Sequence, residues 1–280
     1  MFNLPKIAVT LNITPDSFSD GGRFLSLEKA TEALAGFLEA GADIIDIGGE
    51  STRPNLCANE NKHHGPISTI GHEIEWERIS KVVAQAVEMV AGTNTKISVD
   101  SRNYETFKKA LDLGINIIND VSGLYDKRLI GLLKEYSCQI ITMHNLGVPA
   151  DPQVLIDQSE DATDFIASKL AIIRDSLLES GVRHDQIILD PGIGFGNDAS
   201  QAAQVLNNIH KIQDLGCAVM VGHSRKSFFN QITDLPYSQR DLETHIISVY
   251  LALKKVNIIR VHDLLGTKRA LAAAGLVNWI

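Results

Sequence analysis

The sequence is poor in cysteine, in positive charge and in long apolar runs. Cys57, Cys138 and Cys217 are an odd count without a short pairing pattern, which favours reduced thiols and a cytoplasmic location. The net charge of −8 argues against a general surface for nucleic acid or anionic membranes. No apolar run approaches the roughly 18–20 residues of a membrane span, and the first residues lack the apolar core of a signal peptide. Any anion that the protein binds therefore needs a local basic cluster.

Short apolar runs recur at regular intervals along the chain. Their positions are 7–11, 44–47, 97–99, 115–118, 140–143, 187–189, 218–221 and 258–261. The first and last of these eight runs start 251 residues apart, so the seven intervals average about 36 residues. That is the length of one strand followed by one helix. With 280 residues and 44% hydrophobic content, residues 1–280 are expected to form a single domain with a full core.

The intervals between these runs show the apolar periodicity of amphipathic helices. The predicted helices are 27–40, 74–90, 104–113, 129–136, 154–180, 201–215, 242–255 and 268–277. Ser26 is a plausible N-cap for the first of them. Glycines at 41, 114, 181 and 216 follow helices, as C-capping residues do.

Eight strand–helix units are compatible with a (β/α)₈ TIM barrel or with an open, doubly wound sheet. Polar residues follow every apolar run, namely Asn12, Asp46 with Glu50, Asp100, Asn119 with Asp120, His144, Asp190, Ser224 with Arg225 and Lys226, and His262 with Asp263. A barrel gathers all strand ends around one mouth, whereas an open sheet uses only those near its switch point. The barrel is therefore preferred. Two long polar connections, 12–25 and 48–71, are expected to be mobile loops above this mouth.

Three of the strand ends carry groups suited to one kind of ligand. Asp100 and Asp190 supply carboxylates and Asn119 supplies an amide. Together they could accept the paired N–H donors of a flat heterocycle with an amidine-like edge. The alternative is that each side chain caps a neighbouring helix. Asp190 also begins a turn, DPGIGFG, in which Pro191 and three glycines permit close approach of the backbone.

Cationic side chains follow the last two strands. Arg260 and His262 are two residues apart on a strand and so share one face, which makes them a natural phosphate site, although pairing with Asp263 or Glu243 is an alternative. Lys226 is a compact charge on the preceding loop, and its neighbour Arg225 could instead pair structurally. His144 could line the mouth or make a structural hydrogen bond.

Residues 12–22, NITPDSFSDGG, follow the first strand and would by themselves fit a solvated cluster of turns. The stretch resembles the first signature of the dihydropteroate synthase family. The resemblance continues, in the family's order, through DIGGESTRP at 46–54, SVD at 98–100, IND at 118–120, DPGIGFG at 190–196, GHSRKS at 222–227 and RVHD at 260–263. The polar segment with Cys57, His63 and His64 lacks zinc-ligand spacing and is interpreted as a solvated loop.

The resemblance implies a role for each matching residue. It assigns the pterin pocket to Asp100, Asn119, Asp190 and Lys226, the diphosphate site to Asn12, Arg260 and His262, and the 4-aminobenzoate side to Thr52, Arg53 and Ser224, framed by Phe18 and Pro54. It implies that Asn12 acts through a Mg²⁺ ion and that Asp20 steadies a developing cation. Asp20, Lys226, Arg260 and His262 are thereby the expected catalytic residues.

The reaction implied is condensation of (7,8-dihydropterin-6-yl)methyl diphosphate with 4-aminobenzoate to dihydropteroate and diphosphate. Departures from the family pattern are Asn55, Ser101 and Asn197, together with the long segment 56–70. The alternatives are a pterin-dependent methyltransferase on the same barrel and a non-catalytic pterin-binding paralogue. Homodimers are common in the family, and the predicted helices 242–255 and 268–277 are the expected dimer face.

Overall fold

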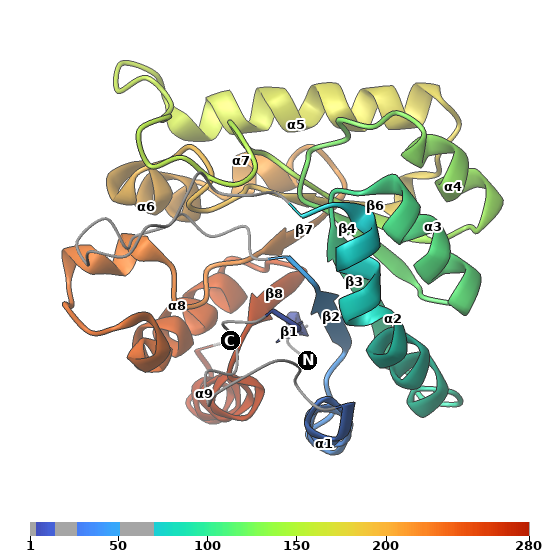
Figure 1. The fold of residues 1–280 in the computed structure, drawn as a ribbon. Coiled ribbons are helices and arrows are strands. Elements are labelled where there is room, and N and C mark those ends of the chain that lie inside the picture. The colour runs from blue at the N-terminus through green and yellow to red at the C-terminus, as the bar shows by residue number, and fades with distance from the viewer. Residues whose placement is uncertain (1–3, 15–26, 51–69, 280) are drawn as a thin grey trace, which may run out of the picture.

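In the computed structural model, which describes residues 4–14, 27–50 and 70–279, parallel strands close into a barrel (Figure 1). The strands are β1 (Lys6–Asn12), β2 (Ile44–Gly48), β3 (Lys96–Ser101), β4 (Ile117–Asp120), β5 (Gln139–Met143), β6 (Ile187–Asp190), β7 (Ala218–Val221) and β8 (Ile258–Val261). Each strand pairs with its neighbours in sequence, and β8 closes the barrel against β1. The predicted (β/α)₈ barrel is confirmed.

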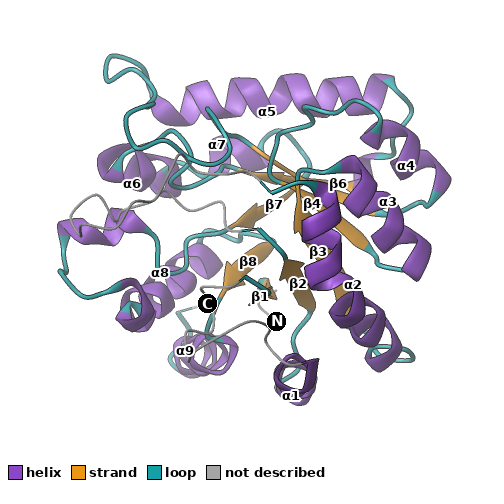
Figure 2. Cartoon of the chain, in the orientation of Figure 1, coloured by secondary structure: helices purple, strands orange, loops and turns teal. Residues whose placement is uncertain are grey.

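Helices surround the strands on the outside (Figure 2). They are α1 (Leu27–Glu39), α2 (His72–Met89), α3 (Tyr104–Leu113), α4 (Leu129–Glu135), α5 (Ala162–Glu179), α6 (Ala199–Asn207), α7 (His210–Gln213), α8 (Asp241–Leu253) and α9 (Leu264–Leu276). Short 3₁₀ turns are η1 (His184–Gln186), η2 (Ser227–Gln231) and η3 (Tyr237–Gln239). In Figure 1, α5 crosses one side of the barrel while α1 and α9 lie on the opposite side.

The strands are apolar on both faces because each face is covered by protein. On β1, the alternate residues Ile7, Val9 and Leu11 belong to the large core between strands and helices. Ala8 points the other way, into the barrel. There it joins a small apolar cluster with Ile44, Ile117, Ile141, Ile188, Met220 and Ile258. This cluster fills the barrel interior and separates its two ends.

Several predicted helices begin or end elsewhere than the apolar pattern suggested. The helix predicted at 154–180 begins only at Ala162, where the Asp161 side chain accepts the N–H of Asp164 as N-cap. Upstream, Ile156 is buried, and its N–H bonds the Gly196 carbonyl at 2.8 Å. Ile156 therefore packs from a loop, which periodicity cannot distinguish from a helix, whereas Val154 and Leu155 are exposed.

Capping explains the other differences. The helix predicted at 201–215 begins at Ala199, because Asp198 and Gln201 form a capping box, and it divides into α6 and α7 around Asn208. The helix predicted from 268 begins at Leu264, because Asp263 accepts the N–H of Gly266. The four predicted C-capping glycines all have positive φ, as predicted.

Within the described ranges, no helix is both long and apolar enough to cross a membrane.

Candidate active site

Polar side chains replace the apolar cluster at the C-terminal end of the barrel. Asp46, Asp100 and Asn119 point inward from the neighbouring strands β2, β3 and β4, and Asp100 lies opposite Asn119 in the register. The amide of Asn119 donates to Asp46 Oδ2 at 3.1 Å. Asp190, at the end of β6, completes this acidic floor, which is almost closed to solvent.

Arg260 reaches across the floor from β8. Its Nε donates to Asp46 Oδ2 at 2.6 Å, and its Nη2 forms a short ion pair with Asp100. Burial disfavours the charged guanidinium, but Asp46, Asp100 and Asp190 outweigh it and raise the pKa of Arg260. The structure thus brings together two of the carboxylates predicted from the strand ends and the predicted anion-binding cation.

Asp100 and Asp190 are held in an environment that opposes their ionisation. Burial raises the pKa of Asp100 to about 7, with the charges of Asp46 and Glu75 adding to it and Arg260 opposing it. Burial likewise raises the pKa of Asp190 to about 6, against the N–H of Gly192 and the charge of Lys226. Such shifts are typical of functional sites.

The turn after β6 shapes the backbone around Asp190. The Gly192 N–H donates to Asp190 Oδ1 at 2.8 Å, and a Cβ on Gly192 would collide with the His144 carbonyl. Buried Asn197 accepts the N–H of Gly194 at 2.8 Å and donates to the Gly192 carbonyl at 2.9 Å. Asn197 is one of the departures from the family pattern. Its two hydrogen bonds stabilise the glycine turn from within.

Lys226 lies over this turn. Its ammonium is 4.5 Å from the centre of the Phe195 ring, a cation–π distance, and its Cδ is 3.7 Å from where a Cβ on Gly194 would be. The positive charge of Lys226 opposes the rise in the pKa of both Asp100 and Asp190. All four residues predicted for the pterin pocket are thus brought to one end of the barrel.

His262 and Ser224 form a second polar group at the mouth. His262 Nδ1 lies 2.9 Å from Ser224 Oγ, and the Tyr237 hydroxyl lies 2.7 Å from His262 Nε2. The imidazole is thereby fixed through both nitrogens. Tyr237 comes from η3, the turn before α8. It was not predicted from the sequence, because no motif includes it.

The alternative pairings of the last strand are wrong. Arg260 pairs with Asp46 and Asp100, while Asp263 lies 3.1 Å from His245. Arg225 makes the structural pair that its sequence position left open. Its guanidinium donates in a fork to Asp241 at 2.7 and 2.8 Å.

Asn12 ends β1 at the same mouth. Its Oδ1 lies 3.5 Å from where a Cβ on Gly48 would be, close to Asp100 on the far side of that glycine. Within the described ranges, no cluster of three or more His, Cys, Asp or Glu side chains could hold a metal by itself. Mg²⁺ commonly takes one or two protein oxygens and completes its shell with water and phosphate oxygens. Asn12 therefore fits an ion that arrives with a phosphorylated substrate.

Several predicted residues lie outside the described ranges. These are Phe18, Asp20, Thr52, Arg53 and Pro54, together with Asn55 and the segment carrying Cys57, His63 and His64. Their assigned roles, and the expected mobility of the two long loops, remain predictions.

Glu75, which the sequence analysis did not single out, supports the floor from behind. This fully buried residue of α2 accepts hydrogen bonds from Ser101, Asn103 and Thr106 at 2.8, 2.9 and 2.6 Å. It therefore fixes the chain directly after Asp100. Burial raises the pKa of Glu75. Ser101, another departure from the family pattern, finds its partner here.

His144 faces away from the site. Its ring packs edge-on against Phe165 of α5 at 5.9 Å. Neither ring nitrogen has a hydrogen-bond partner among the described residues, and burial lowers the pKa of His144 to about 4. The structural hydrogen bond, one of the two roles left open for His144, is absent there, and the side chain packs as a neutral ring.

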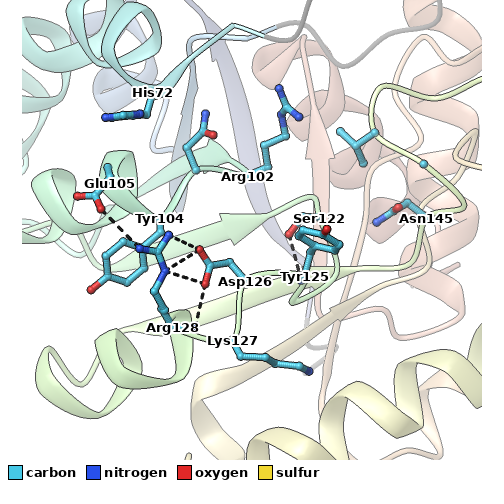
Figure 3. Close-up of a pocket in the computed structure, with 13 residues that line it drawn as sticks. His72, Arg102, Tyr104, Glu105, Ser122, Tyr125, Asp126, Lys127, Arg128 and Asn145 are labelled. Atoms are coloured by element: carbon cyan, nitrogen blue, oxygen red, sulfur yellow. Dashed lines mark hydrogen bonds and ion pairs between the residues drawn. The ribbon is translucent and has the colours of Figure 1, made fainter.

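A separate hollow of about 730 Å³ lies beside the mouth, over the loops that follow β3, β4 and β5 (Figure 3). Its charges are largely satisfied internally. Arg128 is paired with Asp126 at 2.6 Å and with Glu105 at 3.8 Å (Figure 3). Arg102 is paired at 2.9 Å with Glu50, which is not one of the lining residues. None of the predicted site residues lines this hollow.

The barrel fold agrees with the family comparison. The sequence model described as "Pterin binding enzyme" matches residues 9–262. The chain therefore belongs to the pterin-binding enzyme family.

Within this family the similarity is to dihydropteroate synthases. The dihydropteroate synthase of Clostridium beijerinckii is 34% identical over 265 residues, covering 93% of this chain and 89% of that protein. A probable bifunctional folylpolyglutamate synthase/dihydropteroate synthase of Haloferax volcanii is 33% identical over 90% of this chain. The chain spans only 28% of the length of that bifunctional relative.

Solved structures give the same result. Dihydropteroate synthase from Anaplasma phagocytophilum, with bound 6-hydroxymethylpterin-monophosphate, has a TM-score of 0.85 at 33% identity, covering 98% of this chain and 100% of that one. The Xanthomonas albilineans enzyme with 4-aminobenzoic acid also has a TM-score of 0.85, at 28% identity, covering 100% of this chain and 95% of that one.

Proposed function

We propose that this chain condenses (7,8-dihydropterin-6-yl)methyl diphosphate with 4-aminobenzoate, giving 7,8-dihydropteroate and diphosphate. The observation that carries the proposal is the convergence of an acidic floor with cationic groups around one mouth. The ligands of the Anaplasma and Xanthomonas proteins, a pterin monophosphate and 4-aminobenzoic acid, represent the two halves of this reaction.

The floor matches the edge of a pterin. A pterin ring presents paired N–H donors, which a carboxylate can accept in a fork. Asp190 and Asn119 lie on the floor, where they could bind these donors. Asp46 Oδ1 is buried there without a hydrogen-bond partner among the described residues. Buried acceptors left unpaired are costly, so the floor favours a ligand that supplies N–H groups.

The cationic groups suit the leaving diphosphate. Arg260 uses Nε and Nη2 for the floor. Its Nη1 makes no hydrogen bond within the described part of the chain and is left to reach the substrate. His262 is the second cationic group proposed for this site, and one of its ring nitrogens would exchange its present partner, Ser224 or Tyr237, for a phosphate oxygen. Asn12 would hold Mg²⁺, which when bound would neutralise charge on the diphosphate oxygens.

The chemistry requires positioning and charge stabilisation more than a strong base. The methylene C–O bond breaks, the electron pair leaves with diphosphate, and a C–N bond forms to the amine of 4-aminobenzoate. That nitrogen is neutral at pH 7 and loses its proton only after attack. Lys226, Asp100 and Asp190 hold the pterin while Arg260 and His262 stabilise the leaving group. Roles for Asp20, Phe18, Thr52, Arg53 and Pro54 at the second substrate belong to this proposal.

The direct test is a mass-spectrometric assay with both substrates. We expect dihydropteroate and diphosphate in equal amounts. Binding of the pterin substrate without any product would indicate a non-catalytic paralogue. An absence of diphosphate release here, together with methyl transfer when a methylated tetrahydropterin is supplied as donor, would indicate a pterin-dependent methyltransferase.

We further propose a cytoplasmic homodimer. Cys138 and Cys217 are free thiols, consistent with a reducing compartment. Leu242 and Ile246 of α8 are 69% and 60% exposed, and Leu265 of α9 is 62% exposed, which provides apolar surface for a second copy. Sedimentation of the intact protein distinguishes dimer from monomer.

A further inference from the structure

A cavity of about 790 Å³ opens at the N-terminal ends of the strands, at the end of the barrel opposite the acidic floor. Its base is apolar and includes Ile44, Ile188 and Ile258. These residues belong to the cluster that fills the barrel interior. The cavity is therefore separated from the candidate active site by packed side chains.

Three lysines line this cavity, Lys6, Lys96 and Lys255, and the first two stand at the edge of its base. Lys6 begins β1 and Lys96 begins β3, and strand alternation points both toward the barrel axis, in step with Ala8 and Ser98. Lys96 Nζ donates to the neutral amide of Gln139 at 2.7 Å. Within the described residues, neither lysine has a carboxylate within ion-pair distance.

The surroundings of Lys96 disfavour its charged form. Burial lowers the pKa of Lys96, and the charge of Lys6 lowers it further. Among the described lining residues, Asp43 is the only acid, and its Oδ2 accepts the Ile7 N–H at 2.9 Å. One lining carboxylate against more than one lining ammonium group leaves an excess of positive charge, which favours an incoming anion.

The rim adds an exposed aromatic surface. Trp279 lines the cavity and is 66% exposed, and Leu4 beside it is 50% exposed. Large apolar side chains exposed around a concave site are typical of ligand binding. A purely inorganic anion would leave this surface and the isoleucine base unused, and a neutral aromatic would leave the lysines unpaired.

We propose that this cavity is a second ligand site, which binds a small aromatic carboxylate. The ring rests on the isoleucine base beside Trp279, and the carboxylate lies between Lys6 and Lys96. The site is distinct from the proposed 4-aminobenzoate site, which is at the other end of the barrel.

The test uses the intrinsic fluorescence of Trp279. The sequence contains two tryptophans, so Trp76→Phe leaves Trp279 as the only one. In this background, benzoate is expected to change the emission saturably. Lys96→Met should weaken the benzoate affinity about tenfold or more, as loss of a charged hydrogen-bond donor does. Lys108→Met is the matched control, because Lys108 is an exposed lysine of α3 paired with Asp112, and it should leave the affinity unchanged.

Benzamide, which has the same ring without the charge, should bind at least tenfold more weakly than benzoate. If Lys96→Met impairs folding, Lys6→Met provides the same measurement at an exposed position. Equal affinities for benzoate and benzamide, or an affinity unchanged in both lysine variants, would overturn the proposal. So would a fluorescence change that stays linear in benzoate. None of these outcomes bears on turnover at the acidic mouth, so the proposed synthase activity is judged separately.

Discussion

Arg260 Nε donates to Asp46 Oδ2 at 2.6 Å, although the two residues are 214 positions apart in the sequence. The contact joins the last strand of the barrel to the second one across its mouth. Through Nη2 the same guanidinium reaches Asp100, so one cation organises two carboxylates of the floor. The side chain that we assign to the leaving diphosphate is therefore also the one that holds the pterin floor in shape.

Replacement of Arg260 by alanine is expected to lower kcat/KM about 10²-fold or more, because a charged group that stabilises the leaving diphosphate is lost. It also leaves two buried carboxylates without their partner, so the melting temperature should fall. Arg260→Lys is the control for charge without the fork and should recover part of both losses. Steady-state kinetics and thermal unfolding measure the two effects. A near-normal kcat/KM for Arg260→Ala contradicts the anion-site assignment.

Asp190→Asn is expected to weaken binding of a pterin about tenfold or more, because an amide cannot accept two N–H donors as a carboxylate does. Isothermal titration calorimetry with a pterin ligand measures the change. Asp185→Asn, at a carboxylate that is 73% exposed and far from the mouth, is the matched control. Equal pterin affinity for the parent protein and Asp190→Asn removes Asp190 from the pocket.

The stability of the fold should depend on pH through Asp100. Burial raises its pKa to about 7, so the folded state binds the proton more tightly than the unfolded chain, where the pKa is about 4. The contribution of this group to the free energy of unfolding therefore falls as the pH rises from about 4 through about 7. Asp100→Asn removes the titration. Its free energy of unfolding, relative to the parent, should be higher at pH 8 than at pH 5 in urea melts. A difference that stays constant over this range argues against the raised pKa.

Glu75→Ala is expected to destabilise the fold by about 1–3 kcal/mol, since the donors of Ser101, Asn103 and Thr106 lose their buried acceptor. It should also lower kcat/KM, because the chain behind Asp100 is no longer fixed. Glu75→Gln keeps the shape and one acceptor and should cost less. Glu73→Ala, at an exposed position on the same helix, should have little effect. Chemical denaturation and steady-state kinetics of the parent and the three variants measure these effects. A stability loss in Glu75→Ala no greater than in Glu73→Ala would exclude the supporting role of Glu75.

Removal of Mg²⁺ with a chelator is expected to lower turnover, and added Mg²⁺ should restore it. Asn12→Ala should raise the Mg²⁺ concentration needed for half-maximal rate, because the one protein oxygen assigned to the ion is lost. Binding of a pterin without a diphosphate provides the control and should not change in this variant. Full activity in chelator, at every concentration of the diphosphate substrate, contradicts a role for the metal.

The sequence by itself favoured the barrel, and with it the end of the barrel at which the candidate site lies. Apolar runs at even intervals predict strands, and in a parallel barrel the residues after them must meet at one mouth, so Asp100, Asn119, Asp190 and Arg260 were predictable without coordinates. Helix starts were less predictable. Ile156 packs as loop with the same apolar side chain that a helix would bury, and only capping by Asp161 marks the start of α5.

Only the tertiary structure decided which side chains form hydrogen bonds and ion pairs with one another. No sequence motif indicates the hydrogen-bond partners of Asp46, Glu75 and Tyr237, because these partners come from other strands and loops. Their hydrogen bonds, like the lysine pair at the opposite end, depend on the register and closure of the barrel. A linear sequence specifies which side chains face inward, because that follows from local alternation. Which of them come within bonding distance is set by packing between segments far apart in the chain.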